Sequence, residues 1–342
     1  MSLAAPYRPA WLGAGLMLLL AACNSTPDVA GVPPVPRPAL PQPESQGPSQ
    51  AELRKARAER NRALNATAAS AQANVSRASD QRQAEYQEIE ARLRAAGRLR
   101  RDRVPMDAPI DADRLARDFI EIALRDEYSR DGDQLVQNAH SAPLRRWQVP
   151  VRMQVEFGDT ADTAARRLYR AEIASFATRL RGASGHPVET VQSKGNFLVL
   201  VLNEDERAAV MPMLLRLMPD LPARDAAALR DLDPRNFCSV FAYSRGDGAV
   251  YVRAVALIRA ELPPLLRSSC IHEELAQGMG LANDSPDARP SIFNDDEEFA
   301  LLTRHDELLL RILYDPRLRP GMTEAEAAPI IRRIAQELVG TP

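Results

Sequence analysis

The chain has 342 residues, of which 45% are hydrophobic and 26% charged, and its formal net charge is −2. After residue 22 no stretch is apolar enough to span a bilayer, which excludes a protein with several membrane-spanning helices. The part of the chain after residue 104 has about 240 residues, enough to bury a sizeable core, so we expect a globular domain there.

The N-terminus predicts secretion and lipid attachment. Arg8 is the only charged residue before position 28, and an apolar run follows it from Trp11 to Leu20. Such a run has the length of a signal-peptide core and is too short to cross a membrane. The next residues, Leu20-Ala21-Ala22-Cys23, resemble the lipobox of bacterial lipoproteins, in which the cysteine is acylated and becomes the new N-terminus. An ordinary secretory peptide with a chance cysteine is the alternative.

This resemblance implies a signal peptide over residues 1–22 and a lipid anchor on Cys23, with the bilayer as a partner. Residue 24 is Asn rather than Asp, which by the lipoprotein sorting rule favours the periplasmic face of the outer membrane. Residues 24–50 contain eight prolines, so residues 23–50 are predicted to be an extended, semi-rigid linker.

Residues 51–104 predict a charged helical stalk. Ala, Arg, Glu and Gln dominate, proline is absent, and the few large apolar residues keep no heptad register. The segment has 13 Lys and Arg against 7 Asp and Glu. Contact with anionic headgroups or cell-wall polymer is one interpretation, and a solvated stalk is the favoured one. Nucleic acid is not expected as a partner outside the cytoplasm.

Residues 105–342 are predicted to form one α+β domain. Residues 149–157 alternate strictly between apolar and polar, which predicts a half-buried strand. An amphipathic helix follows and is expected to end at Gly182. Residues 197–202 are uniformly apolar, which indicates a buried strand, and residues 238–243 and 249–258 flank a glycine-rich turn as a β-hairpin.

Helices are predicted for the rest of the domain. One covers roughly residues 263–281. Thr303 precedes Asp306 by three residues and Thr323 precedes Glu326 by three, and both patterns are typical of helix starts. Cys238 and Cys270 are the cysteines left after Cys23 is acylated, and an oxidising compartment permits them to pair. We predict a disulfide between them, with two buried thiols as the alternative.

The stretch from Cys270 to Asp284 carries the functional argument. Zinc peptidases of the zincin group carry His-Glu-x-x-His on a helix, where two imidazoles hold zinc and the glutamate is the general base. The metzincin branch adds x-x-Gly-x-x-His, in which glycine turns the chain toward a third ligand. In one frame His272 and Glu273 take the His-Glu positions, and Ala276 then takes the second ligand position.

A second frame fits better because it places a glycine at the turn. Its ligand positions are Glu273, Gln277 and Asn283, its general-base position is Glu274, and its turn glycine is Gly280. On this frame the chain resembles a degenerate zincin of the metzincin (matrixin-like) type over about residues 105–320. Ser291-Ile292-Phe293 resembles the methionine turn, and residues 302–314 resemble the closing helix. The pattern also resembles a bacterial lipoprotein-associated domain of unknown function.

The resemblance implies a zincin-like fold with a mixed sheet and an active-site-type helix. Amide oxygens are weak zinc ligands, so replacing the histidines favours non-catalytic binding of a protein or envelope polymer. The binding cleft would run beside an edge strand, for which residues 249–258 are the candidate. The alternative is an unconventional metal-dependent peptidase or hydrolase with Glu274 as general base. No cofactor is assigned; zinc is one candidate, and calcium, with oxygens from Asp284, Asp295 and Asp296, is another.

Two histidines near this stretch are given structural roles. A lone histidine near a helix start is most often an exposed polar residue, which is the interpretation favoured for His272 over a ligand or acid. His305 follows the predicted helix start at Thr303, so it is expected in the first turn of that helix rather than in a site.

Overall fold

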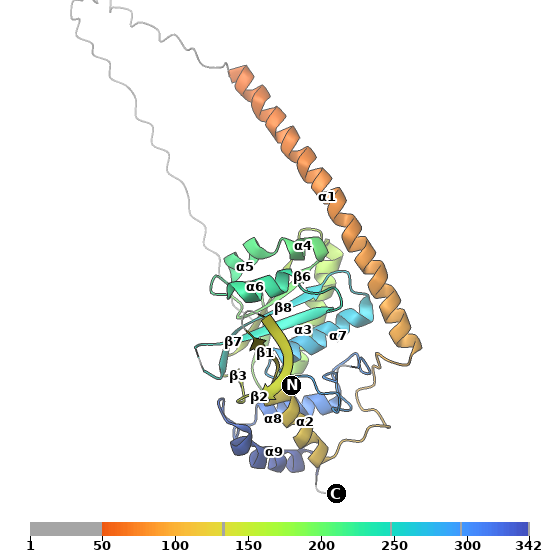
Figure 1. Cartoon of the computed structure of the whole chain (residues 1–342), viewed down its shortest axis with the longest axis vertical. Helices are drawn as coiled ribbons and strands as arrows, with labels where there is room; N and C mark the ends of the chain where they lie inside the picture. The colour runs from red at the N-terminus through yellow and green to blue at the C-terminus, as the bar shows by residue number, and fades with distance from the viewer. Residues whose placement is uncertain (1–49, 132–133, 247, 295, 341–342) are drawn as a thin grey trace, which may run out of the picture. The chain divides into compact units, whose positions relative to one another are not determined.

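The structure, a computed structural model, describes residues 50–131, 134–246, 248–294 and 296–340 (Figure 1). The chain divides into two units, Met1–Glu59 and Arg60–Pro342. The predicted signal peptide, Cys23 and nearly all of the proline-rich linker lie outside the described residues. Among the helices that the structure describes, none is both long and apolar enough to cross a membrane.

The second unit contains both helices and strands. In chain order the elements are α1 (Gln50–Ala95, which begins in the first unit), α2 (Ala112–Ala123), β1 (Arg125–Asp131), β2 (Gln134–Ser141), β3 (Arg146–Trp147), β4 (Val151–Phe157), α3 (Thr163–Ser184), β5 (Val188–Val191), β6 (Phe197–Leu202), α4 (Glu204–Ala208), α5 (Met211–Leu217), α6 (Ala223–Arg230), β7 (Cys238–Ser244), β8 (Val250–Arg259), α7 (Pro264–Gln277), α8 (Arg304–Leu313) and α9 (Glu324–Val339).

A six-stranded sheet organises the domain, in the order β3-β8-β6-β4-β5, with β7 paired to β8. All of these pairings are parallel except β7 with β8, which is antiparallel. A separate two-stranded antiparallel sheet is formed by β1 and β2. The sequence predicted an α+β domain with a mixed sheet. The structure shows a mixed α/β domain, and its sheet is mostly parallel.

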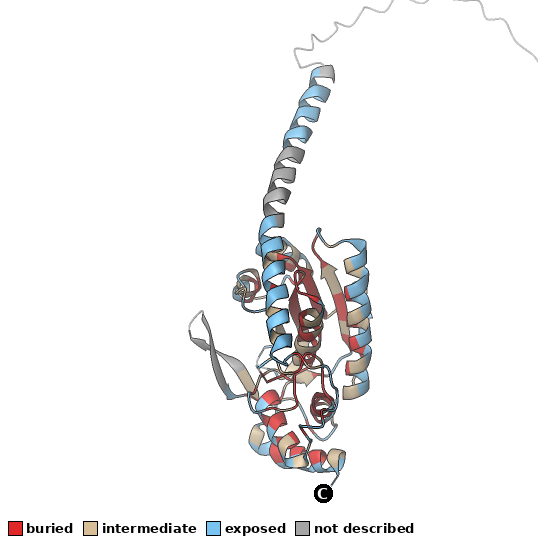
Figure 2. Ribbon diagram, turned by 90° about the vertical axis from the view of Figure 1, so that its right-hand side faces the viewer, coloured by how far each residue is buried: buried red, intermediate tan, exposed pale blue. Residues whose placement is uncertain are grey.

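The sheet separates two hydrophobic clusters, which explains why β6 is apolar throughout. Phe197, Val199 and Val201 belong to the larger cluster, which also contains residues of α2, α3, α7, α8 and α9. The alternate residues Leu198, Leu200 and Leu202 belong to the smaller cluster, formed with α5 and α6. Strands buried on both faces are uniformly apolar for this reason. Figure 2 shows the central strands as the most buried part of the domain.

The structure corrects three sequence-based boundaries. The helix expected to end at Gly182 continues to Ser184, because Gly185 is the residue that adopts the left-handed conformation (φ 72°) and its N–H bonds the carbonyl of Arg181. The helix expected over residues 263–281 ends as α7 at Gln277. The charged helix expected over residues 51–104 ends at Ala95.

The predicted edge strand is also corrected. Strand β8 pairs with β6 on one side and with β7 on the other, so the open edge belongs to β7. The hairpin itself is confirmed, as are the buried strand β6 and the capping boxes at Thr303 and Thr323. The β1–β2 hairpin and the three short helices between β6 and β7 were not recognisable from local sequence patterns.

Candidate functional site

A groove of about 1110 Å³ lies along β7 and α7. Val240 and Ala242 of β7 form one side, and Glu273, Glu274 and Gln277 of α7 line it from the helix. Further acidic side chains reach the groove from the segments around it: Asp126, Asp231, Asp233, Asp284 and Glu297. The two arginines among the lining residues are Arg145, 2.5 Å from Asp126, and Arg235, 2.8 Å from Asp233. Carboxylates therefore outnumber cations along the groove.

The backbone of β7 presents hydrogen-bonding groups to this groove. Ala254 of β8 donates its N–H to Asn196 and Ala260 to Leu202, so the even-numbered residues of this part of β8 are directed toward β6. The odd-numbered residues are then directed toward β7, and the register pairs Ala256 with Val240 and Ala254 with Ala242. Because Ala254 and Ala256 direct their N–H and C=O groups toward β6, they exchange no hydrogen bonds with the residues opposite them in β7. The N–H and C=O groups of Val240 and Ala242 therefore point to the open edge of the sheet.

Arg259, at the end of β8, fixes the loop that forms one end of the groove. Its guanidinium is fully buried and donates to the carbonyls of Leu232, Asp233 and Asn236 at 2.9–3.0 Å. Glu204 neutralises it at 2.5 Å. A buried charge is tolerated only when it is paired and hydrogen-bonded, and Arg259 meets both conditions. Arg259 therefore holds this loop in addition to the loop's own hydrogen bonds, which Arg235 and Asn236 donate to Asp233.

The disulfide and α1 hold α7 against the groove. Cys238 of β7 and Cys270 of α7 form a disulfide with a Cα–Cα distance of 5.9 Å, which confirms the predicted pairing. Helix α7 has no side-chain cap of its own. Glu90 of α1 supplies one, because its carboxylate accepts the N–H groups of Leu265 and Leu266 at 2.9 and 3.1 Å. The end of the predicted stalk is thus part of the framework of the groove.

His272 lies on a different side of α7 from the groove and is not a groove residue. Its ring stacks on Phe176 at 4.1 Å, and its Nδ1 accepts the N–H of Leu302 at 3.0 Å. Burial, aided by the nearby Arg179, lowers the pKa of His272 to about 3, so the ring is neutral. The expectation of an exposed polar histidine is wrong, because the ring packs against α3.

The turn after α7 requires a glycine. Gly280 has φ 124°, and a Cβ at this position would lie 2.4 Å from the carbonyl oxygen of Arg145. Trp147 and Tyr314 fix the same turn through hydrogen bonds to the carbonyls of Gly278 and Met279, at 2.8 and 2.9 Å. The sequence-predicted turn glycine therefore has a steric basis in this fold.

The predicted ligand positions separate into two groups. Glu273, Gln277 and Asp284 meet in the groove with Glu274, and Gln277 donates to Asp284 at 3.0 Å. Asn283 is 3% exposed and donates its amide Nδ2 to the carbonyl of Glu121 at 2.8 Å, while its backbone N–H bonds Ile122. The structure thus uses Asn283 to attach the turn to α2.

A three-ligand zincin site does not fit this arrangement. Glu273 and Gln277 line the groove, whereas Asn283 is buried and is not among the lining residues. Among the described residues no group of three or more His, Cys, Asp and Glu side chains is placed to hold a metal ion. Of the proposed additional oxygens, Asp296 lies beside Arg98 at 3.8 Å, and Asp295 lies outside the described residues.

The segment that resembles a methionine turn is anchored by a buried polar cluster. Asp306 accepts hydrogen bonds from the hydroxyl of Ser291 at 2.6 Å and from the N–H of Thr303 at 2.7 Å. His305, in the first turn of α8 as expected, lies between Asp306 and Asp118, with its Nε2 3.0 Å from Asp118. Burial lowers the pKa of His305, but the hydrogen bonds and charges of the two carboxylates outweigh it and raise the pKa to about 9.

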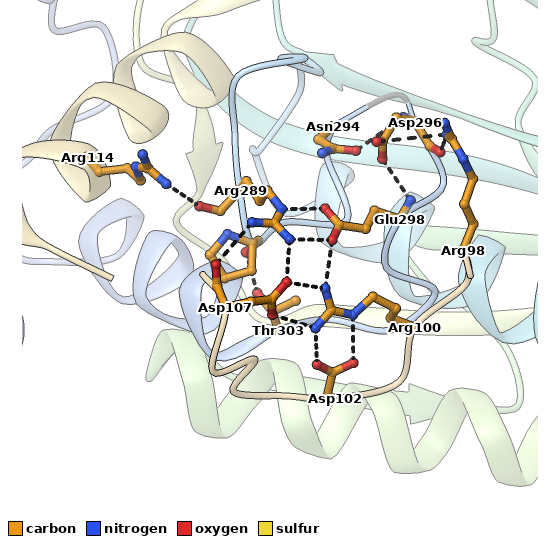
Figure 3. A network of polar contacts seen from close by, with 11 residues as sticks. Arg98, Arg100, Asp102, Asp107, Arg114, Arg289, Asn294, Asp296, Glu298 and Thr303 are labelled. Carbon is orange, nitrogen blue, oxygen red and sulfur yellow. Dashed lines mark hydrogen bonds and ion pairs between the residues drawn. The ribbon is translucent and has the colours of Figure 1, made fainter. Parts of the chain in front are cut away.

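An ion-pair network joins the segment after α1 to the loop between α7 and α8 (Figure 3). Arg100 contacts Asp102, Asp107 and Glu298 at 2.6–2.8 Å, and Arg289 contacts Asp107 and Glu298 at 2.7 Å. These ion pairs fasten the segment between α7 and α8 that contains Glu297, a residue of the groove. The sequence indicated neither this network nor the role of Arg259. A charged residue directly after the apolar run from Ala254 to Ile258 is the signal for the latter.

The fold and the groove define a mixed α/β domain with an acidic groove along its antiparallel edge strand. The profile of a family described as "Protein of unknown function (DUF2927)" matches residues 112–333, which is more than half of the chain. The chain therefore belongs to this family, and the match runs from α2 into α9 and includes the groove. No curated protein and no solved structure matches the chain.

Proposed function

We propose that this protein binds an extended, cationic polypeptide of the cell envelope in the groove, by adding it as a further strand to β7, without hydrolysing it. The observation that carries this proposal is the open edge of β7, where Val240 and Ala242 direct backbone groups into an acidic groove. Strand addition supplies backbone hydrogen bonds for affinity, and the flanking side chains supply selectivity. Among the described residues β7 pairs only with β8.

The charge of the groove supports a cationic partner. Acidic side chains outnumber basic ones among the lining residues, and both arginines, Arg145 and Arg235, lie beside a carboxylate of the groove. Complementary charge steers association and disfavours partners of the wrong sign. An envelope polymer that carries free amino groups has the same chemistry as a cationic peptide, but only a peptide backbone can extend the ladder of β7.

The resemblance to zincins is compatible with the addition of a peptide strand to β7 and with a binding role. The order of the motif positions, the glycine turn after α7 and an edge strand beside that helix agree with the resemblance. Asn283 does not line the groove with Glu273 and Gln277, which favours binding over a three-ligand metal site. The lipid anchor on Cys23 and the periplasmic face of the outer membrane complete the proposal and rest on the N-terminal sequence alone.

The test is peptide binding by a variant that loses one outward N–H. Ala242→Pro removes the N–H that points to the groove and leaves the ladder to β8 intact, because proline is tolerated where a strand's N–H faces outward. Ala242→Val keeps this N–H and is the matched control. Fluorescence anisotropy of a short peptide that alternates lysine and valine should show binding to the full chain and to Ala242→Val, and at least ten-fold weaker binding to Ala242→Pro.

Two outcomes would contradict the proposal. Equal affinity for Ala242→Pro and Ala242→Val would exclude strand addition at β7. Equal affinity for a peptide that alternates glutamate and valine would exclude a cationic partner. Metal analysis separates the hydrolase alternative: one equivalent of zinc, calcium or manganese per chain, lost in Glu273→Ala, together with peptidase activity lost in Glu274→Gln, would favour hydrolysis over binding.

A further inference from the structure

A second concavity, of about 420 Å³, lies between α3 and α8 and shares no lining residue with the groove. Leu308 of α8 and Leu338 of α9 contribute apolar surface. The charged residues that line it are four arginines and one glutamate, namely Arg103, Arg179, Arg304, Arg311 and Glu307. We refer to this concavity as the arginine pocket. Its charge is opposite in sign to that of the groove.

Glu307 lies at the centre of the arginine pocket and is ionised. Its carboxylate accepts hydrogen bonds from Arg103 and Arg179 at 3.0 Å and from Arg304 at 3.3 Å. Burial raises the pKa of Glu307, but the hydrogen bonds and charges of Arg103 and Arg179 outweigh burial and hold the pKa below its ordinary value. One negative charge therefore faces four positive charges among the lining residues.

Backbone carbonyls orient two of the guanidinium groups without neutralising them. Arg311 donates to the carbonyl of Ala183 at 3.0 Å, at the end of α3, and Arg179 donates to the carbonyl of Leu302 at 2.6 Å. The side chains of Arg103 and Arg304 are 56% and 46% exposed, so solvent reaches the pocket from their side.

We infer that the arginine pocket binds a phosphate-bearing anion. A guanidinium presents a planar fork of donors that matches a phosphate, and clustered arginines are the usual means of recognising this group. The excess of positive charge suits an anionic phosphate group, and the leucines offer an apolar surface to the group esterified to it. The same chemistry is found in a soluble phosphate compound and in the headgroup of an anionic phospholipid.

The experiment uses the full chain with Cys23→Ser, which removes the predicted site of acylation. One arm titrates pyrophosphate by calorimetry. The other measures co-sedimentation with phosphatidylglycerol vesicles and with phosphatidylcholine vesicles as the neutral control. The test variant is Arg304→Ala, and the matched control is Arg216→Ala, an exposed arginine of α5 that lines neither concavity.

Arg304→Ala should weaken binding about ten-fold, the effect of one charge-assisted hydrogen bond, and Arg216→Ala should leave it unchanged. Pyrophosphate binding with this pattern identifies a soluble ligand. Binding that requires phosphatidylglycerol, without binding of pyrophosphate, identifies a lipid headgroup. Binding of neither probe, or an equal effect of the two variants, overturns the inference. Circular dichroism checks folding, and Arg103→Ala replaces Arg304→Ala if that variant unfolds.

Discussion

Two arginine clusters of the domain differ in their balance of charge. In the network of Figure 3, Arg100 and Arg289 face Asp102, Asp107 and Glu298, so each guanidinium is enclosed by carboxylates. In the arginine pocket four guanidinium groups share Glu307. The first cluster fastens one loop to another, whereas the second keeps positive charge directed into a concavity. The local count of carboxylates, rather than the residue type, distinguishes a structural arginine from a binding one.

The largest effect on stability is expected at a cluster in which carboxylates outnumber the cation. His305 lies between Asp118 and Asp306, and its pKa is raised from 6.5 to about 9. Its contribution to stability is therefore fully present below about pH 6.5 and is lost as the pH rises through about 9, amounting to about 3 kcal/mol. Urea unfolding at about pH 6 and about pH 10 measures it. His305→Asn should remove most of the difference, and a wild-type protein equally stable at both pH values would contradict the prediction.

Glu307→Ala should have the next largest effect. It removes the carboxylate of the arginine pocket and leaves its guanidinium groups facing one another, so we expect a loss of about 2 kcal/mol in the free energy of unfolding. Added pyrophosphate should raise the melting temperature of this variant if the anion takes the place of the carboxylate. A variant that melts like the wild type would show that the pocket arginines do not repel one another appreciably.

Arg289→Ala should lower the free energy of unfolding by less than Glu307→Ala does. The network of Figure 3 retains Arg100 with its carboxylates, and the side chain of Arg289 is 37% exposed, so solvent screening limits the loss to about 1 kcal/mol or less. Thermal unfolding measures this change. Pyrophosphate affinity is the second readout, and it should be unaffected, because Arg289 does not line the arginine pocket. A fall in affinity would mean that the two clusters are not independent.

Arg304→Ala should have the smallest effect on stability. This exposed arginine contributes one long contact to Glu307 while being repelled by three other guanidinium groups, so its removal should change the free energy of unfolding by less than about 0.5 kcal/mol. The loss of about ten-fold in anion binding should therefore occur without loss of stability. Higher salt should reduce even this small difference. A large destabilisation would place Arg304 among the structural arginines.

The sequence predicted those parts of the fold that depend on local patterns. The apolar run of β6, the hairpin of β7 and β8 and the capping boxes at Thr303 and Thr323 were all recognisable, because periodicity and short-range hydrogen bonds determine them. The disulfide between β7 and α7 was predicted from the compartment and the cysteine count. Which strand forms the edge of the sheet depends on long-range pairing, and the sequence assigned it to β8 instead of β7.

The candidate site was predicted only in part, because local spacing brings some of its residues together and long-range contacts place the others. Glu273, Glu274 and Gln277 meet in the groove because their spacing keeps them together on α7. The side chain of Asn283 lies beyond the turn, and it is oriented by a hydrogen bond to the carbonyl of Glu121 in α2, which is far away in the sequence. The contribution of Arg259 was not recognisable, since its partners in the loop after α6 are met only in the folded chain.

The contacts of α1 have a mechanical consequence. Tyr86 donates to the carbonyl of Pro234 at 2.8 Å, and Glu90 holds the first amides of α7, so one helix touches both the loop and the helix that frame the groove. This helix is also the covalent route from the N-terminal side of the chain to the domain. A pull along the chain from that side therefore acts first on Ser79, which donates to Glu261 just after β8, and then on Tyr86 and Glu90, whose partners frame the groove.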